Sequence, residues 1–195
     1  MANVRKLNRD EAVACFDQLA DLRITVFREW PYLYDGDLAY ERDYLATYFE
    51  SPNAFIAGVF DGDQLVGAST ASPLEDHAGE FAAPFKERGL DVKDYFYFGE
   101  SVLLPAYRGQ GLGVAFFGLR EAEARRQGFQ YCTFCAVERP DEHPGRPANY
   151  KKLDSFWRTR GYQKIDQLQT YFAWKDVGVD QETEKPMVFW AKLLK

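Results

Sequence analysis

Apolar residues recur at helical spacing in four parts of the chain. After Asn8, which can cap a helix together with Glu11 three residues on, apolar side chains follow at intervals of three or four positions. Later stretches show the same period, and prolines or glycines stop them. We therefore predict helices from Asn8 to before Pro31, from near Asp37 to Ser51, from Leu112 to Gly128 and from Asn149 to Arg160.

Shorter apolar runs between these segments have the length and the composition of strands. The turn at residues 61–64 (Asp-Gly-Asp-Gln) joins two of them as a hairpin. Residues 73–94 are mixed and charged, and we expect a lid or substrate loop there, with a short helix around Phe81 and Phe85. The predicted strands run from Val4 to Leu7, Ala54 to Phe60, Leu65 to Ala71, Tyr95 to Leu104, Phe129 to Val137, Gln169 to Trp174 and Met187 to Leu194.

The alternation of strands and helices without a flexible linker predicts one α/β domain with a mixed sheet over residues 1–195. The composition agrees, because 46% hydrophobic and 28% charged residues are close to the average of globular proteins. Aromatic residues, at 16%, can supply a sizeable core. The net charge of −6 argues against a nucleic-acid partner and suits a neutral or cationic small substrate.

The three cysteines do not form the pattern of a metal site. Cys132 and Cys135 make a single CxxC, which neither a second pair nor a histidine pair accompanies. We expect both thiols to pack among apolar neighbours in a strand, with a redox pair as the alternative. No metal cofactor and a cytoplasmic location are therefore expected. Neither a signal peptide nor an apolar run of about eighteen residues is present, so no membrane association is expected.

The most informative segment follows the strand that is predicted to end at Leu104. It reads Arg108-Gly109-Gln110-Gly111-Leu112-Gly113 and leads directly into a predicted helix. Closely spaced glycines let the backbone approach a ligand, and a helix N-terminus offers unpaired N–H groups to phosphate. Neither a P-loop lysine nor the Rossmann glycine spacing is present. We predict a phosphate-bearing ligand here, with a turn that binds no ligand as the alternative.

This hexapeptide resembles the Arg/Gln-x-x-Gly-x-Gly/Ala signature of the GNAT family of N-acetyltransferases. The order of predicted elements is similar to that family over most of the chain, and residues 149–162 resemble its penultimate helix. The resemblance implies an α/β fold with a mixed, mostly antiparallel sheet of about seven strands, flanked by helices and splayed between the fourth and fifth strands. It also implies acetyl-CoA as the acyl donor and cosubstrate.

The resemblance further implies which residues hold that cosubstrate. Backbone groups at the end of the motif strand would face the pantetheine arm, and the amides of the glycine-rich turn would surround the pyrophosphate. Asn149 would bind the CoA arm, unless it only caps its helix. The implied CoA-binding residues are Val102, Leu103, Leu104, Arg108, Gly109, Gln110, Gly111, Leu112, Gly113 and Asn149.

The implied reaction is direct attack of an amine on the thioester, which requires a base because the attacking amine must be neutral. Glu100 is the first candidate, since it lies on the motif strand where many family members have a catalytic or water-binding glutamate. The alternative is that Glu100 binds the substrate cation or pairs with a lysine. Glu41, Asp43 and Glu75 are lesser candidates, which we expect to be solvated charges.

The general acid departs from the family pattern. The family often has a tyrosine four residues before the glycine of the penultimate helix, but Trp157 stands there and cannot supply the proton. Tyr150 is the candidate replacement, with water or a purely structural role for Tyr150 as alternatives. The missing tyrosine keeps open a second interpretation, in which the chain is a catalytically silent module or sensor that binds CoA or acyl-CoA.

In this fold the acceptor groove is built by the first two helices, their loop and the last hairpin. Trp30, Tyr32 and Tyr34 in that loop are the predicted substrate-binding residues, and Tyr40 and Tyr44 follow in the next helix. An aromatic and partly acidic groove suits an amine that carries an apolar or cationic group. We therefore expect a small-molecule or peptide amine as the acceptor. A homodimer is compatible with the fold, although no feature of the sequence specifies one.

Overall fold

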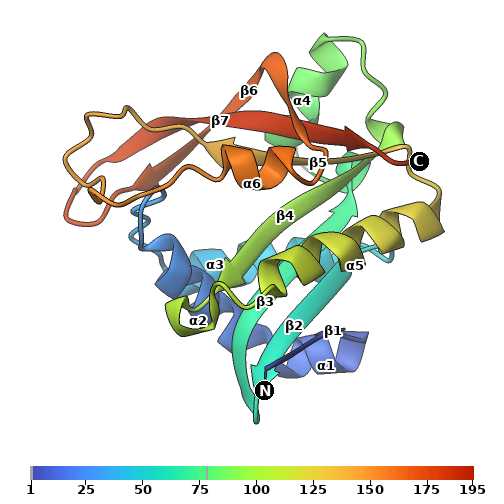
Figure 1. Ribbon diagram of the computed structural model, residues 1–195, viewed down its shortest axis with the longest axis horizontal. Coiled ribbons are helices and arrows are strands. Elements are labelled where there is room, and N and C mark those ends of the chain that lie inside the picture. The colour runs from blue at the N-terminus through green and yellow to red at the C-terminus, as the bar shows by residue number, and fades with distance from the viewer. Residues whose placement is uncertain (1, 78) are drawn as a thin grey trace.

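The computed structural model describes residues 2–77 and 79–195 and contains one seven-stranded sheet with the order β1-β2-β3-β4-β5-β7-β6 (Figure 1). Neighbouring strands are antiparallel except β4 and β5, which run parallel. The strands are β1 (Asn3–Lys6), β2 (Phe55–Asp61), β3 (Gln64–Pro73), β4 (Tyr95–Leu103), β5 (Tyr131–Val137), β6 (Gln163–Lys175) and β7 (Glu182–Leu193).

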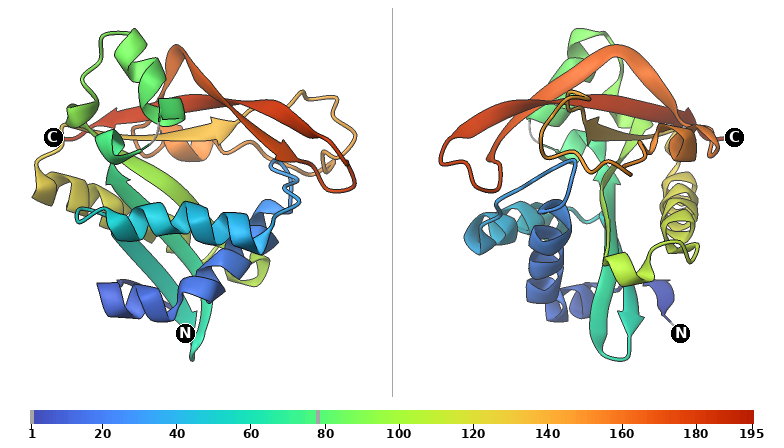
Figure 2. Two further views of the ribbon diagram at one scale, coloured as in Figure 1. Left: turned by 180° about the vertical axis from the view of Figure 1, so that it is seen from behind. Right: turned by 60° about the vertical axis from the view of Figure 1, so that its left-hand side comes forward.

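Helices cover both faces of this sheet. Helices α2 and α3 pack on one face of the central strands, and α5 packs on the other (Figure 2). Helix α4 lies against β6. The α-helices are α1 (Arg9–Ala14), α2 (Phe16–Phe27), α3 (Leu38–Glu50), α4 (Gly79–Glu87), α5 (Leu112–Gln127) and α6 (Asp154–Arg158), with short 3-10 turns η1 (Leu74–Asp76), η2 (Val92–Asp94) and η3 (Pro105–Tyr107).

The parallel pair is short and then opens. β4 pairs with β5 only from Tyr95, opposite Tyr131, to Tyr97, opposite Thr133, although β4 continues to Leu103. Beyond Tyr97 the backbone edge of β4 that faces β5 therefore has no strand partner in the part of the chain that the structure describes. The predicted fold class is confirmed: the sheet is mixed, mostly antiparallel and splayed between its fourth and fifth strands.

A bulge lies in β4 where the two strands separate. Ser69 faces Ser101, and Ala71 faces Phe98. Two residues of β4, Gly99 and Glu100, therefore lie opposite the single residue Thr70 of β3. A Cβ atom at Gly99 would collide with the Tyr48 hydroxyl and with Thr70. Glycine is therefore required here by close packing from α3.

Four predicted elements, two helices and two strands, have other bounds in the structure. The first predicted helix is interrupted at Cys15 and continues as α2. The predicted helix from Asn149 to Arg160 is reduced to α6, because Tyr150 is held in a turn by its N–H bond to the Pro147 carbonyl. The last two strands extend well beyond their apolar stretches, since pairing between β6 and β7 continues through polar residues at the edge of the sheet.

The remaining structural predictions concern the cysteines and the region after β3. Cys132 and Cys135 are buried free thiols in β5, as predicted. Burial raises the pKa of each to about 12, which keeps both protonated and disfavours the redox alternative. The short helix around Phe81 and Phe85 is present as α4. Within residues 2–77 and 79–195, no group of histidine, cysteine and acidic side chains could hold a metal, and no helix is long and apolar enough to cross a bilayer.

Candidate active site

The turn between β4 and α5 is shaped by two glycines with left-handed backbone. Gly109 has φ 77° and Gly111 has φ 83°, and Gly111 begins α5 without a side-chain cap. Apart from each glycine and its two chain neighbours, no heavy atom of the described residues lies within 4 Å of the position that a Cβ would take there. Leu112 is buried in the core and anchors the first turn of the helix. The uncapped amides of the α5 N-terminus are therefore accessible to an anion.

Arg108 braces this turn. Its Nε donates to the Leu103 carbonyl over 3.0 Å, and its Nη1 pairs with Glu29 over 2.8 Å. The Gln110 side chain donates to the Ala106 carbonyl over 3.1 Å. The Arg108 side chain is 44% exposed, so its charge remains next to the turn although Glu29 shares it. The predicted arginine thus also fixes the path of the chain from β4 into α5.

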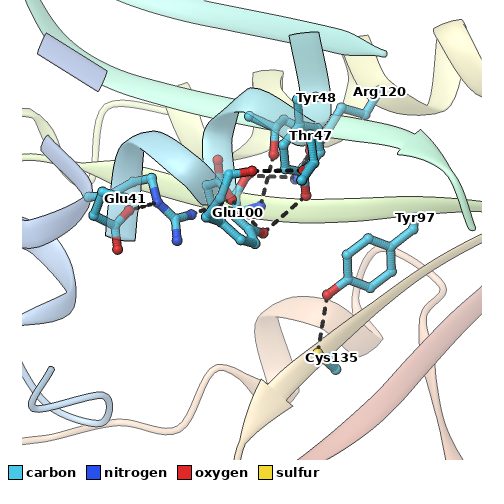
Figure 3. Close-up of polar contacts among 10 residues, drawn as sticks. Glu41, Thr47, Tyr48, Tyr97, Glu100, Arg120 and Cys135 are labelled. Carbon is cyan, nitrogen blue, oxygen red and sulfur yellow. Dashed lines mark hydrogen bonds and ion pairs between the residues drawn. The ribbon is translucent and has the colours of Figure 1, made fainter. Parts of the chain in front are cut away.

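Glu100 projects from the β4 bulge into a buried ion-pair cluster (Figure 3). Its Oε2 accepts a hydrogen bond from Nη1 of Arg23 over 2.5 Å and a longer one from the Tyr44 hydroxyl over 3.5 Å. Its Oε1 is buried without a hydrogen-bond partner among the described residues. The alternative of a lysine partner is wrong, since the cation is Arg23 of α2.

Glu41 belongs to the same cluster, and the prediction that it is solvated is wrong. Its side chain is fully buried, and its Oε2 accepts a hydrogen bond from Nε of Arg23. Tyr44 and Phe27 enclose the guanidinium, with ring centroids 4.2 and 5.0 Å from its central carbon. Burial alone would lower the pKa of Arg23, but the neighbouring Glu100, Tyr44 and Glu41 groups raise it above its ordinary value.

Two of the predicted aromatic acceptor residues, Trp30 and Tyr32, pack against aromatic rings from later parts of the chain. Trp30 packs against Tyr150, with ring centroids 5.9 Å apart. Burial raises the pKa of Tyr32, and nearby Cys135, Glu100 and Tyr150 act in the same direction. The loop after α2 and the segment before α6 therefore meet in space. Burial also raises the pKa of Tyr34, with a further contribution from the charge of Glu41.

One side chain joins three distant parts of this region. Arg139, which follows β5, forms two hydrogen bonds with Asp176, of 2.8 and 2.7 Å. It also donates to the carbonyls of Pro31 and Tyr32, over 3.0 and 2.7 Å. Trp174 of β6 donates to the same Tyr32 carbonyl over 3.0 Å. The loop that carries the predicted acceptor residues is therefore fixed from the C-terminal half of the chain.

The family model of the acetyltransferase (GNAT) family matches residues 17–147 of the sequence. The chain belongs to this family. The matched segment contains the bulged strand, the glycine-rich turn and α5. A comparison with curated protein sequences found no significant match.

Solved structures resemble this GNAT chain over nearly its whole length. A ribosomal-protein-alanine N-acetyltransferase from Brucella melitensis has a TM-score of 0.63 at 13% identity, covering 98% of this chain and 99% of its own. An aminoglycoside 6'-N-acetyltransferase in complex with coenzyme A has a TM-score of 0.61 at 19% identity, covering 99% and 97%. The Salmonella typhimurium protein yncA, solved with its cofactor acetyl-CoA, has a TM-score of 0.59 at 12% identity, covering 100% and 94%. These likenesses establish the shared fold.

Two predicted GNAT site residues lie outside the helix that was expected to carry them. Asn149 is exposed in a turn and caps no helix, because α6 begins only at Asp154. Tyr150 is not a residue at a helix start, but its ring reaches Trp30 from the loop. Burial raises the pKa of Tyr150 above its ordinary value. Trp157 packs between Phe134 and Trp190, each 5.1 Å away between ring centroids.

The end of the GNAT motif strand has one amide on its open side. The N–H of Leu104 donates to the Val66 carbonyl of β3 over 3.0 Å. Since successive amides of a strand point in opposite directions, the N–H of Leu103 points away from β3, toward the gap left by β5. The Val102 side chain is fully buried beneath this edge.

Two further charged residues of this region, Arg23 and Arg120 of α5, are not among those predicted from the sequence. Arg23 stands four residues after Leu19 and four before Phe27, so the helical period puts it on the buried face of α2. Arg120 stands four residues after Phe116 and four before Ala124, again on the buried face. The available signal was a charged residue at a position where the helical period predicts an apolar one. Glu41, four residues before Leu45, is another example.

Proposed function

We propose that this GNAT chain transfers an acetyl group from acetyl-CoA to a primary amine of a small molecule or peptide, by direct attack in a ternary complex. One observation carries the proposal: the open edge of β4 is followed by η3 and then by the uncapped N-terminus of α5, with Gly109 and Gly111 in left-handed conformation. An extended ligand that ends in a pyrophosphate matches this combination of an unpaired strand edge and an anion site.

The residues of the turn fit such a ligand. Amides from Gly109 to Gly113 are proposed to bind the pyrophosphate, with Arg108 adding positive charge, and the Leu103 amide to bind the pantetheine arm. The glycine positions are open to a closely approaching ligand, since no atom occupies the space of their missing Cβ atoms. Acetyl-CoA, when bound, supplies the activated acetyl thioester. The coenzyme A and acetyl-CoA of two similar structures support this assignment.

Glu100 is proposed as the general base. Proton transfer from the acceptor ammonium to the carboxylate leaves a neutral amine, which is the form able to attack. The position of Glu100 supports the role, because it lies in the bulge where β4 leaves β5 and has one oxygen without a hydrogen-bond partner among the described residues. Tyr150 is proposed to give a proton to the departing sulfur. Its raised pKa keeps the hydroxyl protonated at neutral pH, so the proton is available.

The acceptor is proposed to bind between the loop after α2 and the segment before α6. Trp30, Tyr32 and Tyr34 are the proposed contacts, and their rings can hold an apolar or cationic group. The Glu41 and Glu100 carboxylates outnumber Arg23 in the buried cluster, and their charges act on Tyr34 and Tyr32, which favours a cationic amine.

Calorimetric titration of the ligand-free chain with acetyl-CoA and with CoA tests the cosubstrate. We expect micromolar binding of both, followed by acetyl transfer in an assay across a panel of primary amines. Binding without transfer to any amine would instead favour the silent CoA-binding module. If neither acetyl-CoA nor CoA binds, the enzyme proposal is removed altogether.

A further inference from the structure

Glu41 is a buried acid to which the proposed mechanism gives no chemical step. It lies on α3, and its carboxylate shares the Arg23 guanidinium with Glu100 of β4: Nε bonds to Glu41 and Nη1 to Glu100. The exposed fraction of the residue is 0% for Glu41, 4% for Glu100 and 7% for Arg23. All three groups are therefore shielded from solvent, so their charges interact strongly.

The cluster carries more negative than positive charge. Two carboxylates face one guanidinium, and Oε1 of Glu41 and Oε1 of Glu100 are both buried without a hydrogen-bond partner among the described residues. Burying an unbalanced carboxylate is unfavourable, and replacing such a cluster by apolar side chains is often neutral or stabilising. Stability alone therefore does not account for the second acid.

The other groups around Glu100 do not supply a second positive charge to its carboxylate. The Tyr44 hydroxyl reaches Oε2 over 3.5 Å and bonds to the Tyr48 hydroxyl over 3.1 Å. Arg120, from the opposite face, donates to the Glu100 main-chain carbonyl and not to its carboxylate. The charged and titratable groups around Glu100 are Arg23 of α2, Glu41, Tyr44 and Tyr48 of α3, Arg120 of α5 and Tyr32 of the following loop, with Thr70 of β3 bonded to its N–H.

We propose that Glu41 is a positioning residue that keeps Glu100 basic by taking up the positive charge of Arg23. The inference rests on the proposed function, since it concerns the same base. The negative charge of Glu41 offsets part of the positive charge of Arg23 that acts on Glu100, so the Glu100 carboxylate can accept a proton from the acceptor ammonium. The proton moves from nitrogen to a Glu100 oxygen, the negative charge of Glu100 and the positive charge of the ammonium disappear together, and Arg23 remains charged. Without Glu41, the full charge of Arg23 would stabilise the Glu100 carboxylate and weaken it as a base.

Two variants separate this role from mere packing. Glu41→Gln keeps the shape of the side chain but removes its charge, so Arg23 faces Glu100 alone. The double variant Arg23→Met with Glu41→Gln removes one charge of each sign and leaves Glu100 without its counterion. Glu50→Gln, an exposed change at the end of the same helix, is the matched control for loss of one negative charge.

The first readout is the titration of the Glu100 carboxyl group in ligand-free protein, followed by NMR on chains labelled with ¹³C at the glutamate carboxyl carbons. Glu100→Gln identifies the signal. We expect Glu41→Gln to move the Glu100 midpoint down by about one pH unit and the double variant to move it up. The acidic limb of the pH–rate profile should shift in the same two directions, with kcat of Glu41→Gln reduced roughly fivefold and KM for acetyl-CoA unchanged.

The outcomes are distinct. Opposite shifts in the two variants support the proposal, and an unmoved midpoint in Glu41→Gln, or shifts of the same sign, overturns it. If Glu41→Gln does not fold, the comparison of Arg23→Met with the double variant decides, because loss of the Glu41 charge should make the Glu100 midpoint lower in the double variant than in Arg23→Met. Equal midpoints in these two variants would overturn the proposal. Absence of acetyl transfer by the wild-type chain would contradict the proposed function alone. The titration of Glu100 in ligand-free protein measures the charge balance of the cluster independently of catalysis.

Discussion

Arg120 donates from its guanidinium to the carbonyl oxygen of Glu100 over 3.1 Å, on the sheet face opposite the Glu100 carboxylate (Figures 2 and 3). The same side chain reaches the Thr70 carbonyl over 3.4 Å and the Ser101 hydroxyl over 2.7 Å. Burial lowers the pKa of Arg120 to about 10, which leaves it charged at neutral pH. Arg120 therefore satisfies main-chain groups that the bulge takes out of the regular ladder, while Arg23 holds the side chain of the same residue.

Arg120→Met should destabilise the fold by about 3 kcal/mol, because it leaves buried acceptors without a donor. The free energy of unfolding in urea measures this directly. Arg125→Met is the matched control on the same helix, because the Arg125 side chain is 44% exposed, and it should change the free energy by less than about 1 kcal/mol. Equal losses in the two variants would contradict the role given to Arg120.

Gly111→Val should abolish binding of CoA, since a side chain would enter the space left for the pyrophosphate. Gly128→Val is a matched control at the other end of α5: its φ of 87° is as unfavourable for valine as the 83° of Gly111, and both positions are open. Each variant should lose about 1 to 2 kcal/mol of stability. Calorimetry should then find normal CoA affinity only in Gly128→Val, and retained affinity in folded Gly111→Val would remove the pyrophosphate assignment.

Glu100→Gln should lower kcat by roughly 100-fold or more and leave the affinity for acetyl-CoA nearly unchanged, because it removes the proposed base and no contact with the cosubstrate. The variant should remain folded, since Arg23 keeps Glu41 as its counterion. Steady-state kinetics from pH 5 to pH 10 give the check. If the pH–rate profile of the variant matches that of the wild type, Glu100 is not the base.

His77 should make the fold less stable in mildly acidic solution. Burial lowers its pKa from 6.5 to about 4, and its Nε2 lies 2.6 Å from the Ser72 hydroxyl. The unfolded chain therefore takes up a proton on this residue near pH 6.5, whereas the folded chain does so only near pH 4. The stabilisation is complete above pH 6.5 and decreases by up to about 3 kcal/mol as the pH falls to 4.

Urea unfolding at several pH values tests this dependence. His77→Gln should flatten the curve between pH 6.5 and 4, while His143→Gln, at the only other histidine of the chain, should leave the contribution of His77 in place. A slope that persists in His77→Gln would assign the acid sensitivity to other groups.

The fold could be predicted from the sequence because its strongest signals are local. The capping residues at Asn8 and the glycines at 111 and 128 mark helix ends through backbone conformation, which short segments determine by themselves. The helix predicted at Asn149 failed because its apolar spacing competes with the turn that follows Pro147. The prediction missed the polar ends of β6 and β7 because the pairing of each end depends on its partner strand, and no single segment encodes that pairing.

The candidate site could be predicted only in part. The turn at residues 108–113, proposed to bind an anion, is recognisable from six consecutive residues of the sequence. Glu100 could be proposed from its place on the preceding strand. The partner of Glu100 could not be predicted, because Arg23 lies 77 positions away in the sequence and only the packing of α2 against β4 brings the two residues together. The sequence predicts a solvated Glu41 because charged side chains are usually exposed, although its place four residues before the apolar Leu45 of α3 argues for burial.

The contacts of Arg139 also have a consequence for the order in which the chain can mature during synthesis. The bond between Arg120 and the Glu100 carbonyl spans 20 positions, so the bulge can form early. The Tyr32 carbonyl instead waits for partners 107 and 142 positions later, at Arg139 and Trp174. The loop after α2 is therefore synthesised early and fixed late. A nascent chain that ends before β6 and β7 would contain the turn at residues 108–113 but would lack contacts that fix the proposed acceptor-binding loop.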